Sequence, residues 1–234
     1  MTLFNQLNKM SKSIDYDKAL EYWAEIPATV DGVLGGFGYI SNMDIIGSTQ
    51  FLNNLFSQEN GPGRQIALDC GAGIGRITKH LLAPHFNEVD VIEPDKKFLT
   101  ELLNYVGADS KKVGTLYNSS LQNFQPERKY DVIWNQWVLG YLKNEDLVSY
   151  LITCRKSLTK NGVIIVKENV TSSGFTEPDE ADSSITRCLK QYITIFKKAN
   201  LKRIKQCKQT NFPNGIYPVY MFALIPNEDH SSDQ

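Results

Sequence analysis

The spacing of apolar residues changes near residue 65, and from there two patterns alternate along the chain. Short apolar runs typical of strands are separated by stretches with apolar residues three and four positions apart, typical of helices. The expected strands are residues 66–70, 88–94, 112–118, 130–137, 162–169, 201–210 and 217–225, and the expected helices are residues 77–86, 95–107, 145–158 and 181–200, with a turn at 158–162. This alternation predicts a doubly wound α/β fold, with a mostly parallel seven-stranded, Rossmann-like sheet whose last two strands can pair antiparallel.

The first 60 residues have a different pattern. Helical spacing is present in residues 15–24 and 44–56, and the stretch between them, IPATVDGVLGGFGYIS, combines glycines with apolar side chains. A loop with these two properties usually covers a binding site. We therefore expect residues 1–60 to form an N-terminal helical extension and substrate-covering loop within the same domain as a core of residues 61–226. The first 13 residues and the tail 227–234 are polar and are expected to be disordered.

Composition and charge narrow the class of protein. The 234 residues carry a formal net charge of −1, with 41% hydrophobic and 22% charged residues, as is typical of a soluble globular protein. The absence of a basic excess argues against a nucleic-acid partner. We found no apolar run long enough to span a bilayer and no signal-peptide pattern. We expect a cytoplasmic monomer without a membrane partner.

The cysteines and histidines do not follow a metal-binding pattern. The four cysteines, Cys70, Cys154, Cys188 and Cys207, include no C-x-x-C pair, and no histidine stands at ligand spacing from them. Free thiols in a reducing compartment, and no metal site, are the expected result.

A glycine-rich turn is the strongest chemical signal. The segment LDCGAGIGR follows the first expected strand and carries Gly71, Gly73 and Gly75 in the spacing G-x-G-x-G. Glycines allow a tight turn and a close approach of a ligand to the backbone. The third glycine comes one residue earlier than in the dinucleotide motif G-x-G-x-x-G, and Arg76 follows it. This variant fits a cofactor without phosphate, such as S-adenosylmethionine, whose carboxylate Arg76 and the helix N-terminus can hold.

Residues after the next strands fit the rest of such a cofactor. Glu93 ends the second strand, where a carboxylate can accept hydrogen bonds from two ribose hydroxyls. Leu121 and Gln122 follow the third strand, where the adenine edge would lie, and Gln136 follows the fourth strand, near the methionine part. Taken alone, each glutamine position favours a surface loop residue over a cofactor contact.

Candidate substrate residues lie at the ends of the later strands. The fourth strand ends in WNQW and lacks the N-P-P-aromatic motif that adenine and glutamine-amide methyltransferases carry. Trp137 is instead expected at the edge of the site, and Trp134 is expected in the core. Asn169 ends the fifth strand, and Tyr217 lies in the loop before the last strand. The acidic cluster of Asp179, Glu180 and Asp182 can cap the helix expected at 181–200 or receive a cationic substrate.

Five segments together resemble the α-N-terminal protein methyltransferase family, within the class I S-adenosylmethionine-dependent superfamily. They are YW-x-x-IP-x-TVDG-x-LGG-x-G, LDCGAGIGRITK, YDVIW-x-QWV-x-G, DSS and IY-x-VY, and the resemblance covers Tyr22 to Ile225. It implies methylation of the α-amino group of proteins that begin X-Pro-Lys after removal of Met, ribosomal proteins among them.

The resemblance also implies roles for individual residues. Cofactor contacts are implied at Gly71, Arg76, Glu93, Leu121, Gln122 and Gln136, and peptide contacts at Trp23, Leu34, Trp137, Asn169, Asp179, Asp182, Ser184 and Tyr217. Asp182 and Asn169 are the expected catalytic residues. The chain departs from some relatives at two positions, where Glu93 replaces an aspartate and Tyr141 replaces a histidine that has been given a proton-shuttling role.

The expected reaction is an in-line transfer of a methyl group to a neutral amine. A free α-amino group has a pKa of about 7.7–8.0, so a fraction is neutral at pH 7. Asp182 can orient the amine and take a proton, although its charge also raises the pKa of the amine. Asn169 would bind the first peptide unit, and Trp23 and Trp137 would enclose the second residue. The family resemblance further implies that Asp179 pairs with the third-position lysine, whereas the residues alone indicate only an acidic groove.

Alternative functions remain open from the sequence. One is a methyltransferase of the same fold that acts on a small-molecule amine or on RNA, although the near-neutral net charge and the acidic cluster count against RNA. Another is a non-catalytic protein that retains the cofactor fold, which the intact Gly71, Arg76 and Glu93 disfavour. A nicotinamide oxidoreductase is disfavoured by the glycine spacing.

Overall fold

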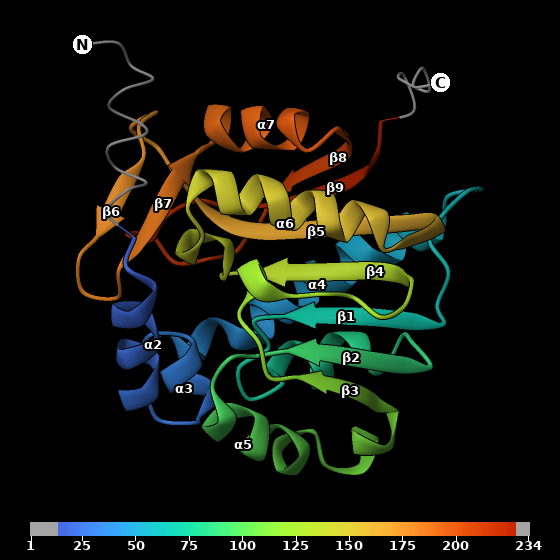
Figure 1. Cartoon of the computed structure of the whole chain (residues 1–234), viewed down its shortest axis with the longest axis horizontal. Coiled ribbons are helices and arrows are strands. Elements are labelled where there is room, and N and C mark those ends of the chain that lie inside the picture. The colour runs from blue at the N-terminus through green and yellow to red at the C-terminus, as the bar shows by residue number, and fades with distance from the viewer. Residues whose placement is uncertain (1–13, 228–234) are drawn as a thin grey trace.

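The computed structural model describes residues 14–227 and has a main sheet with the strand order β3-β2-β1-β4-β5-β9-β8 (Figure 1). These strands span Ile66–Cys70 (β1), Glu88–Ile92 (β2), Val113–Tyr117 (β3), Tyr130–Gln136 (β4), Leu158–Thr171 (β5), Leu201–Lys208 (β8) and Val219–Pro226 (β9). The first five are parallel, and β9 runs antiparallel to both β5 and β8. The predicted seven-stranded, mostly parallel sheet is confirmed, whereas the predicted disorder of the two termini concerns residues outside the described range.

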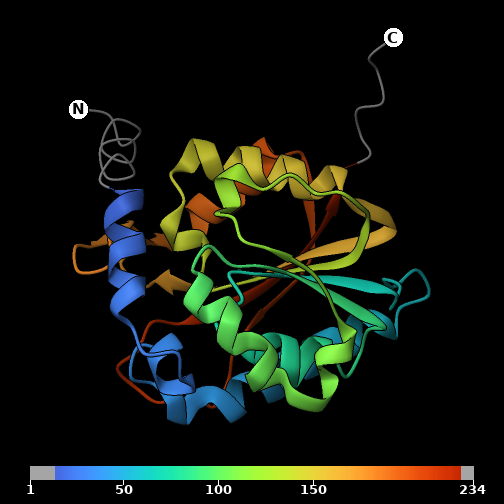
Figure 2. The ribbon, with the colours of Figure 1, turned by 60° about the horizontal axis from the view of Figure 1, so that its bottom comes forward.

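Helices cover both faces of the sheet. They span Tyr16–Glu25 (α2), Val30–Val33 (α3), Ser41–Phe56 (α4), Lys96–Val106 (α5), Asn144–Lys156 (α6) and Leu189–Lys198 (α7). Figure 2 shows α6 and α7 on one side of the sheet and α4 and α5 on the other. Successive residues of a strand point to opposite faces, so Leu68 packs in the core with α6 and α7, whereas Ala67 packs in the core with α4. None of the helices within residues 14–227 could cross a membrane.

Residues 177–188 form a hairpin where the sequence predicted the start of a helix. Strands β6 (Glu177–Asp179) and β7 (Ser184–Cys188) pair antiparallel, and β7 also pairs with the end of β5. The helix predicted over residues 181–200 is therefore wrong in its first half. The physical reason is a tertiary contact, because the fully buried guanidinium of Arg187 donates to the backbone carbonyls of Leu139 (2.6 Å) and Leu142.

Two local predictions also need correction. The turn predicted at residues 158–162 belongs to β5, where Leu158 pairs with Tyr130 of β4 before the register of the two strands shifts. The helix predicted over residues 77–86 contains one short π-helical turn, Thr78–Leu82. In both places tertiary packing on the neighbouring elements overrides a local preference.

The N-terminal extension lies across the carboxyl ends of the parallel strands. Figure 1 shows α2 and α3 to the left of the arrowheads of β4, β1 and β2. The carboxyl ends of the strands form the edge where open α/β sheets bind ligands. Asp15 caps α2, since its carboxylate accepts hydrogen bonds from the backbone N–H groups of Asp17 (3.1 Å) and Lys18 (3.2 Å). The hydroxyl of Tyr16 donates to Asp146 in the first turn of α6, which fixes the first turn of α2 to the core.

The other end of α2 is held by a lysine of the core. Lys97, at the start of α5, donates from Nζ to the backbone carbonyls of Trp23 (3.2 Å), Ala24 (2.6 Å) and Ile26 (2.6 Å). The last carbonyls of a helix have no partner within the helix, and a cation there also interacts favourably with the helix dipole. Lys97 therefore secures the end of α2 over the sheet.

Replacing Lys97 with methionine is expected to loosen α2 without unfolding the core. The substitution keeps the apolar stem but removes about 1–2 kcal/mol of local stabilisation. Hydrogen exchange read by mass spectrometry should show faster exchange in residues 16–25 and unchanged exchange in the central strands. Lys96→Met is the matched control, because Lys96 is exposed, and equal exchange of α2 in the two variants would contradict the role of Lys97.

Candidate active site

The turn after β1 requires its glycines. Gly71, Gly73 and Gly75 have φ values of 68°, 53° and 81°, in the region that side chains with a Cβ rarely adopt. A Cβ on Gly71 would also lie 2.4 Å from Cγ2 of Val138. The turn therefore depends on glycine both for its conformation and for its close packing.

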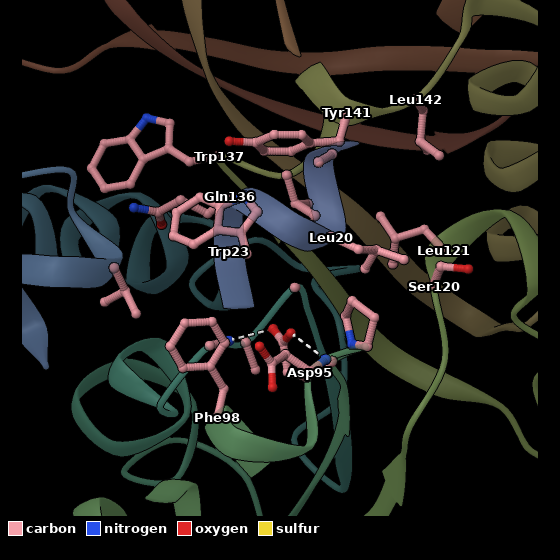
Figure 3. A pocket seen from close by; sticks show the side chains of 18 of the residues that line it. Leu20, Trp23, Asp95, Phe98, Ser120, Leu121, Gln136, Trp137, Tyr141 and Leu142 are labelled. Carbon is pink, nitrogen blue, oxygen red and sulfur yellow. Dashed lines mark hydrogen bonds between the residues drawn. The ribbon is translucent and has the colours of Figure 1, made fainter. Parts of the chain in front are cut away.

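A pocket opens beside this turn at the carboxyl edge of the sheet. Its walls come from α2, the glycine turn, the end of β2, the loop after β3 and the end of β4. Figure 3 shows Trp137 and Tyr141 on one side of the pocket and Asp95 and Phe98 on the opposite side. The residues predicted to contact the cofactor all line it: Gly71, Arg76, Glu93, Leu121, Gln122 and Gln136.

Glu93 presents a carboxylate held by the backbone. Its oxygens accept hydrogen bonds from the N–H groups of Gly73 (2.8 Å) and Asp95 (3.0 Å), which leaves further lone pairs for a ligand. Burial raises the pKa of Glu93 to about 7, although the two N–H groups oppose this shift. Asp69, by contrast, does not line the pocket, because its carboxyl is buried and accepts a hydrogen bond from Thr78 (2.6 Å).

Arg76 lines the pocket and is anchored by a residue that the sequence analysis missed. Its Nη1 lies 2.7 Å from Oδ2 of Asp44, which is fully buried in α4. Gln136 also binds Asp44, since its Nε2 lies 2.9 Å from both carboxylate oxygens, and its Oε1 accepts from the indole of Trp134. The amide of Gln136 is thus largely occupied by protein groups, and Trp134 lies in the core as predicted.

The chemistry of the pocket fits S-adenosylmethionine. Apolar walls formed by Leu20, Phe98 and Leu121 can enclose an adenine ring, Glu93 can accept hydrogen bonds from ribose hydroxyls, and Arg76 can pair with a carboxylate. Leu20 and Phe98 were not predicted as cofactor residues. Their apolar positions in helical stripes were the only sequence signal, and core residues share that signal.

Three of the predicted peptide-binding residues line the same pocket. They are Trp23 of α2, Leu34 of the glycine-rich loop, and Trp137. Trp137 has an unusual backbone for a bulky residue, with φ at 52°. Its indole Nε1 is buried without a hydrogen-bond partner. Strained backbone and unpaired polar groups are concentrated at functional sites. Trp137 is therefore a candidate ligand contact in the pocket.

The other five predicted peptide-binding residues do not line this pocket, and the structure places them behind or beside it. Asn169 is in β5 opposite Val219, Ser184 pairs with Asp179 in the β6–β7 hairpin, and the exposed Tyr217 donates to Glu177 (2.6 Å). Asp182 also lies in the hairpin segment. Asp179 and Asp182, together with Glu177 and Glu180 of the same hairpin, form an acidic rim that Tyr141 contacts from the pocket.

Tyr141 connects the pocket to this rim. It lines the pocket, packs against Trp23 with ring centroids 6.0 Å apart, and donates its hydroxyl to Oδ2 of Asp182 at 2.6 Å. The other oxygen of Asp182 accepts the N–H of Ser184 (3.0 Å). Burial, together with the charge of Asp182, raises the pKa of Tyr141 well above its usual value. Tyr141 is therefore a neutral donor at physiological pH.

No cluster of three or more His, Cys, Asp or Glu side chains within residues 14–227 could hold a metal ion. All four cysteines are free thiols, and three of them, Cys70, Cys154 and Cys188, are buried. Asp44 and Asp182, two carboxylates near the pocket, are instead bonded to Arg76 and Tyr141.

Comparisons with known proteins identify the family of this chain. A family model described as AdoMet-dependent proline di-methyltransferase matches residues 11–225. The chain is 46% identical over 214 residues to alpha N-terminal protein methyltransferase 1 of Drosophila melanogaster, covering 90% of this chain and 76% of that protein. It is also 46% identical over 212 residues to N-terminal Xaa-Pro-Lys N-methyltransferase 1 of Xenopus tropicalis, covering 89% and 94% of the two chains.

A solved structure shares both the fold and the sequence pattern. The S-adenosylmethionine-dependent methyltransferase of Leishmania major matches with a TM-score of 0.84 at 38% identity, covering 89% of this chain and 82% of that chain. The chain therefore belongs to the family of AdoMet-dependent proline di-methyltransferases.

Proposed function

We propose that this methyltransferase modifies the α-amino group of proteins that begin X-Pro-Lys after removal of the initiator methionine. The observation that carries the proposal is the contact between Tyr141 in the cofactor pocket and Asp182 on the acidic rim. It brings a carboxylate that suits an amine next to the pocket for the methyl donor. The curated substrate class of the relatives supports the same assignment.

When bound, S-adenosylmethionine supplies a methyl group on a sulfonium, which transfers in line to a nitrogen lone pair. The protein must therefore hold the amine in its neutral form and align it. Asp182 already accepts hydrogen bonds at both oxygens, from Tyr141 and Ser184. These two bonds fix the position of the carboxylate and leave further lone pairs on its oxygens for the amine. We propose that it orients the amine first and takes a proton, directly or through water, second.

The remaining peptide contacts follow the order of the substrate residues. Trp23 and Trp137 would enclose the second-position proline, and Asn169 would bind the first peptide unit. Asp179, which is exposed at the end of β6, would pair with the third-position lysine. Leu34, in the glycine-rich loop that lies over the pocket, would cover the entering chain, while Ser184 and Tyr217 would contact the peptide along the rim.

The broader setting of the reaction is part of the same proposal. We propose that ribosomal proteins are among the substrates, and that the protein acts as a monomer in the cytoplasm without nucleic-acid or membrane partners. The formal net charge of −1 supports the absence of a nucleic-acid partner. The acidic rim supports a preference for the basic N-termini that ribosomal proteins carry.

Mass spectrometry of a methylated peptide is the direct test. A synthetic peptide beginning Pro-Pro-Lys, incubated with the protein and S-adenosylmethionine, should gain methyl groups on the α-nitrogen, and at least two should be added, as in a di-methyltransferase. The same peptide with an acetylated N-terminus should gain none. Binding of the cofactor without any gain would reject the proposed substrate, and a product with only one methyl group would contradict repeated methylation.

Substitutions on the acidic rim should separate orientation of the amine from recognition of the lysine. Asp182→Asn is expected to lower kcat about 10²-fold or more, because it removes the group that orients and deprotonates the amine. Asp179→Asn should mainly raise KM for the Lys peptide, since its contact is remote from the reacting nitrogen. Steady-state kinetics from pH 6 to 9 would decide, and wild-type turnover of Asp182→Asn at every pH would reject its catalytic role.

Substitutions of Tyr141 test whether its hydroxyl contributes to removal of the proton from the amine. Tyr141→Phe removes the hydrogen bond that holds the charged carboxylate of Asp182 in place, so kcat/KM should fall about tenfold. Tyr141→His should restore activity and add a new ionisation at about pH 6.5. An unchanged rate and pH profile in Tyr141→Phe would show that the hydroxyl has no role in proton handling.

A further inference from the structure

Arg76 is held by one edge of its guanidinium. Its contact with Oδ2 of Asp44 (2.7 Å) and a longer contact with the hydroxyl of Ser41 (3.4 Å) both use Nη1. The side chain is 4% exposed, and the residue lines the pocket. An arginine has five N–H donors, so the groups at Nε and Nη2 are the ones that can face a ligand.

A second cation, Lys167, limits the number of hydrogen bonds that Arg76 makes with Asp44. The Nζ atom of Lys167 lies 2.5 Å from Oδ1 of Asp44, and Gln136 donates to both carboxylate oxygens. Arg–carboxylate pairs favour a bidentate arrangement with two parallel hydrogen bonds. Because Lys167 and Gln136 occupy Asp44, Arg76 makes a single short contact with it.

Lys167 itself has no contact with the pocket. It is fully buried, and its Nζ also donates to the carbonyl of Asp44 (3.1 Å), the hydroxyl of Ser48 (2.8 Å) and Oε1 of Gln209 (2.8 Å). With Oδ1 of Asp44, four oxygens surround an ammonium group that has three N–H donors, so every donor has a partner. Burial tends to raise the pKa of Asp44, but the charges of Lys167 and Arg76 outweigh it and hold the pKa below its usual value.

Two cations therefore share one carboxylate in the interior. A buried charge is costly unless it is paired. Among the described residues, Arg76 has no ion pair with a carboxylate other than Asp44, and the carboxyl of Asp69 is bonded to Thr78. The charge of Arg76 is thus only partly neutralised by the protein, and the open pocket is the direction from which an anion can approach.

We propose that Lys167, through Asp44, positions Arg76 and preserves its charge for the carboxylate of S-adenosylmethionine. Lys167 is a positioning residue, since it touches Asp44 and not the ligand. Lys167 neutralises the carboxylate of Asp44. Asp44 can then hold the guanidinium of Arg76 in place while the positive charge of Arg76 stays available to an anionic ligand. This inference rests on the proposed cofactor contact of Arg76 and does not depend on the identity of the methylated peptide.

Binding of two cofactor analogues measures this effect. S-adenosylhomocysteine carries the carboxylate, whereas 5′-methylthioadenosine shares the adenosine and thioether but lacks the amino-acid end. Calorimetry should show that the wild type prefers S-adenosylhomocysteine. In Lys167→Met this preference should fall about tenfold, as for the loss of a charge-assisted hydrogen bond, with the Kd of 5′-methylthioadenosine unchanged.

A double variant distinguishes this role from a packing role. In Asp44→Asn/Lys167→Met the carboxylate is also neutral, so Arg76 regains its free charge and part of the lost preference should return. If the two residues only support the fold, the double variant should bind S-adenosylhomocysteine no better than Lys167→Met, and the proposal would be overturned. A parallel loss of affinity for both analogues, or no loss at all, would overturn it as well.

Two controls complete the design. Arg128→Met breaks another ion pair to a fully buried carboxylate, that of Asp90 (2.9 Å), away from the pocket, and should leave both Kd values unchanged. If the wild type failed to prefer S-adenosylhomocysteine, the assignment of Arg76 to the cofactor carboxylate would be wrong. Failure of peptide methylation would instead leave these binding results intact, so the two proposals fail separately.

Discussion

The structure depends on the pairing of one buried carboxylate. Asp44 of the N-terminal extension is fully buried and contacts Arg76 after β1, Gln136 at the end of β4 and Lys167 in β5. A charge in the interior must be neutralised and hydrogen-bonded, or folding becomes unfavourable by several kcal/mol. Pairing of Asp44 therefore requires α4 and three elements of the core to meet at one point. Two of the partners of Asp44, Arg76 and Gln136, line the cofactor pocket.

The same extension completes the pocket from the other side. The residues of α2 supply apolar walls such as Leu20 and Trp23, and Lys97 and Tyr16 hold the two ends of the helix. An apolar wall excludes water and strengthens the electrostatic contacts beneath it. The extension is thus part of the active site, and its two anchors set how closely the site is covered.

Tyr141 changes the chemistry available at the boundary between cofactor and substrate. A histidine at this position could accept a proton near neutral pH, whereas the raised pKa of Tyr141 keeps it protonated. Its hydroxyl donates to Asp182, which lies on the acidic rim where the amine would bind. Under the proposed function, proton removal would therefore rely on the carboxylate and solvent, and on the fraction of amine that is already neutral.

The sequence by itself determined the features that depend on neighbouring residues. The order of strands and helices, the glycine turn and the placement of Glu93 at the end of β2 follow from local spacing, since parallel strands bring their carboxyl ends to one edge. It could not predict the β6–β7 hairpin, because the buried contacts of Arg187 come from residues more than 40 positions away. The same limit applies to Asp44, which a local pattern places in the first turn of a surface helix. Only the tertiary structure brings it to Lys167, 123 positions along the chain, because the pairing of a buried charge is decided by which distant elements pack together.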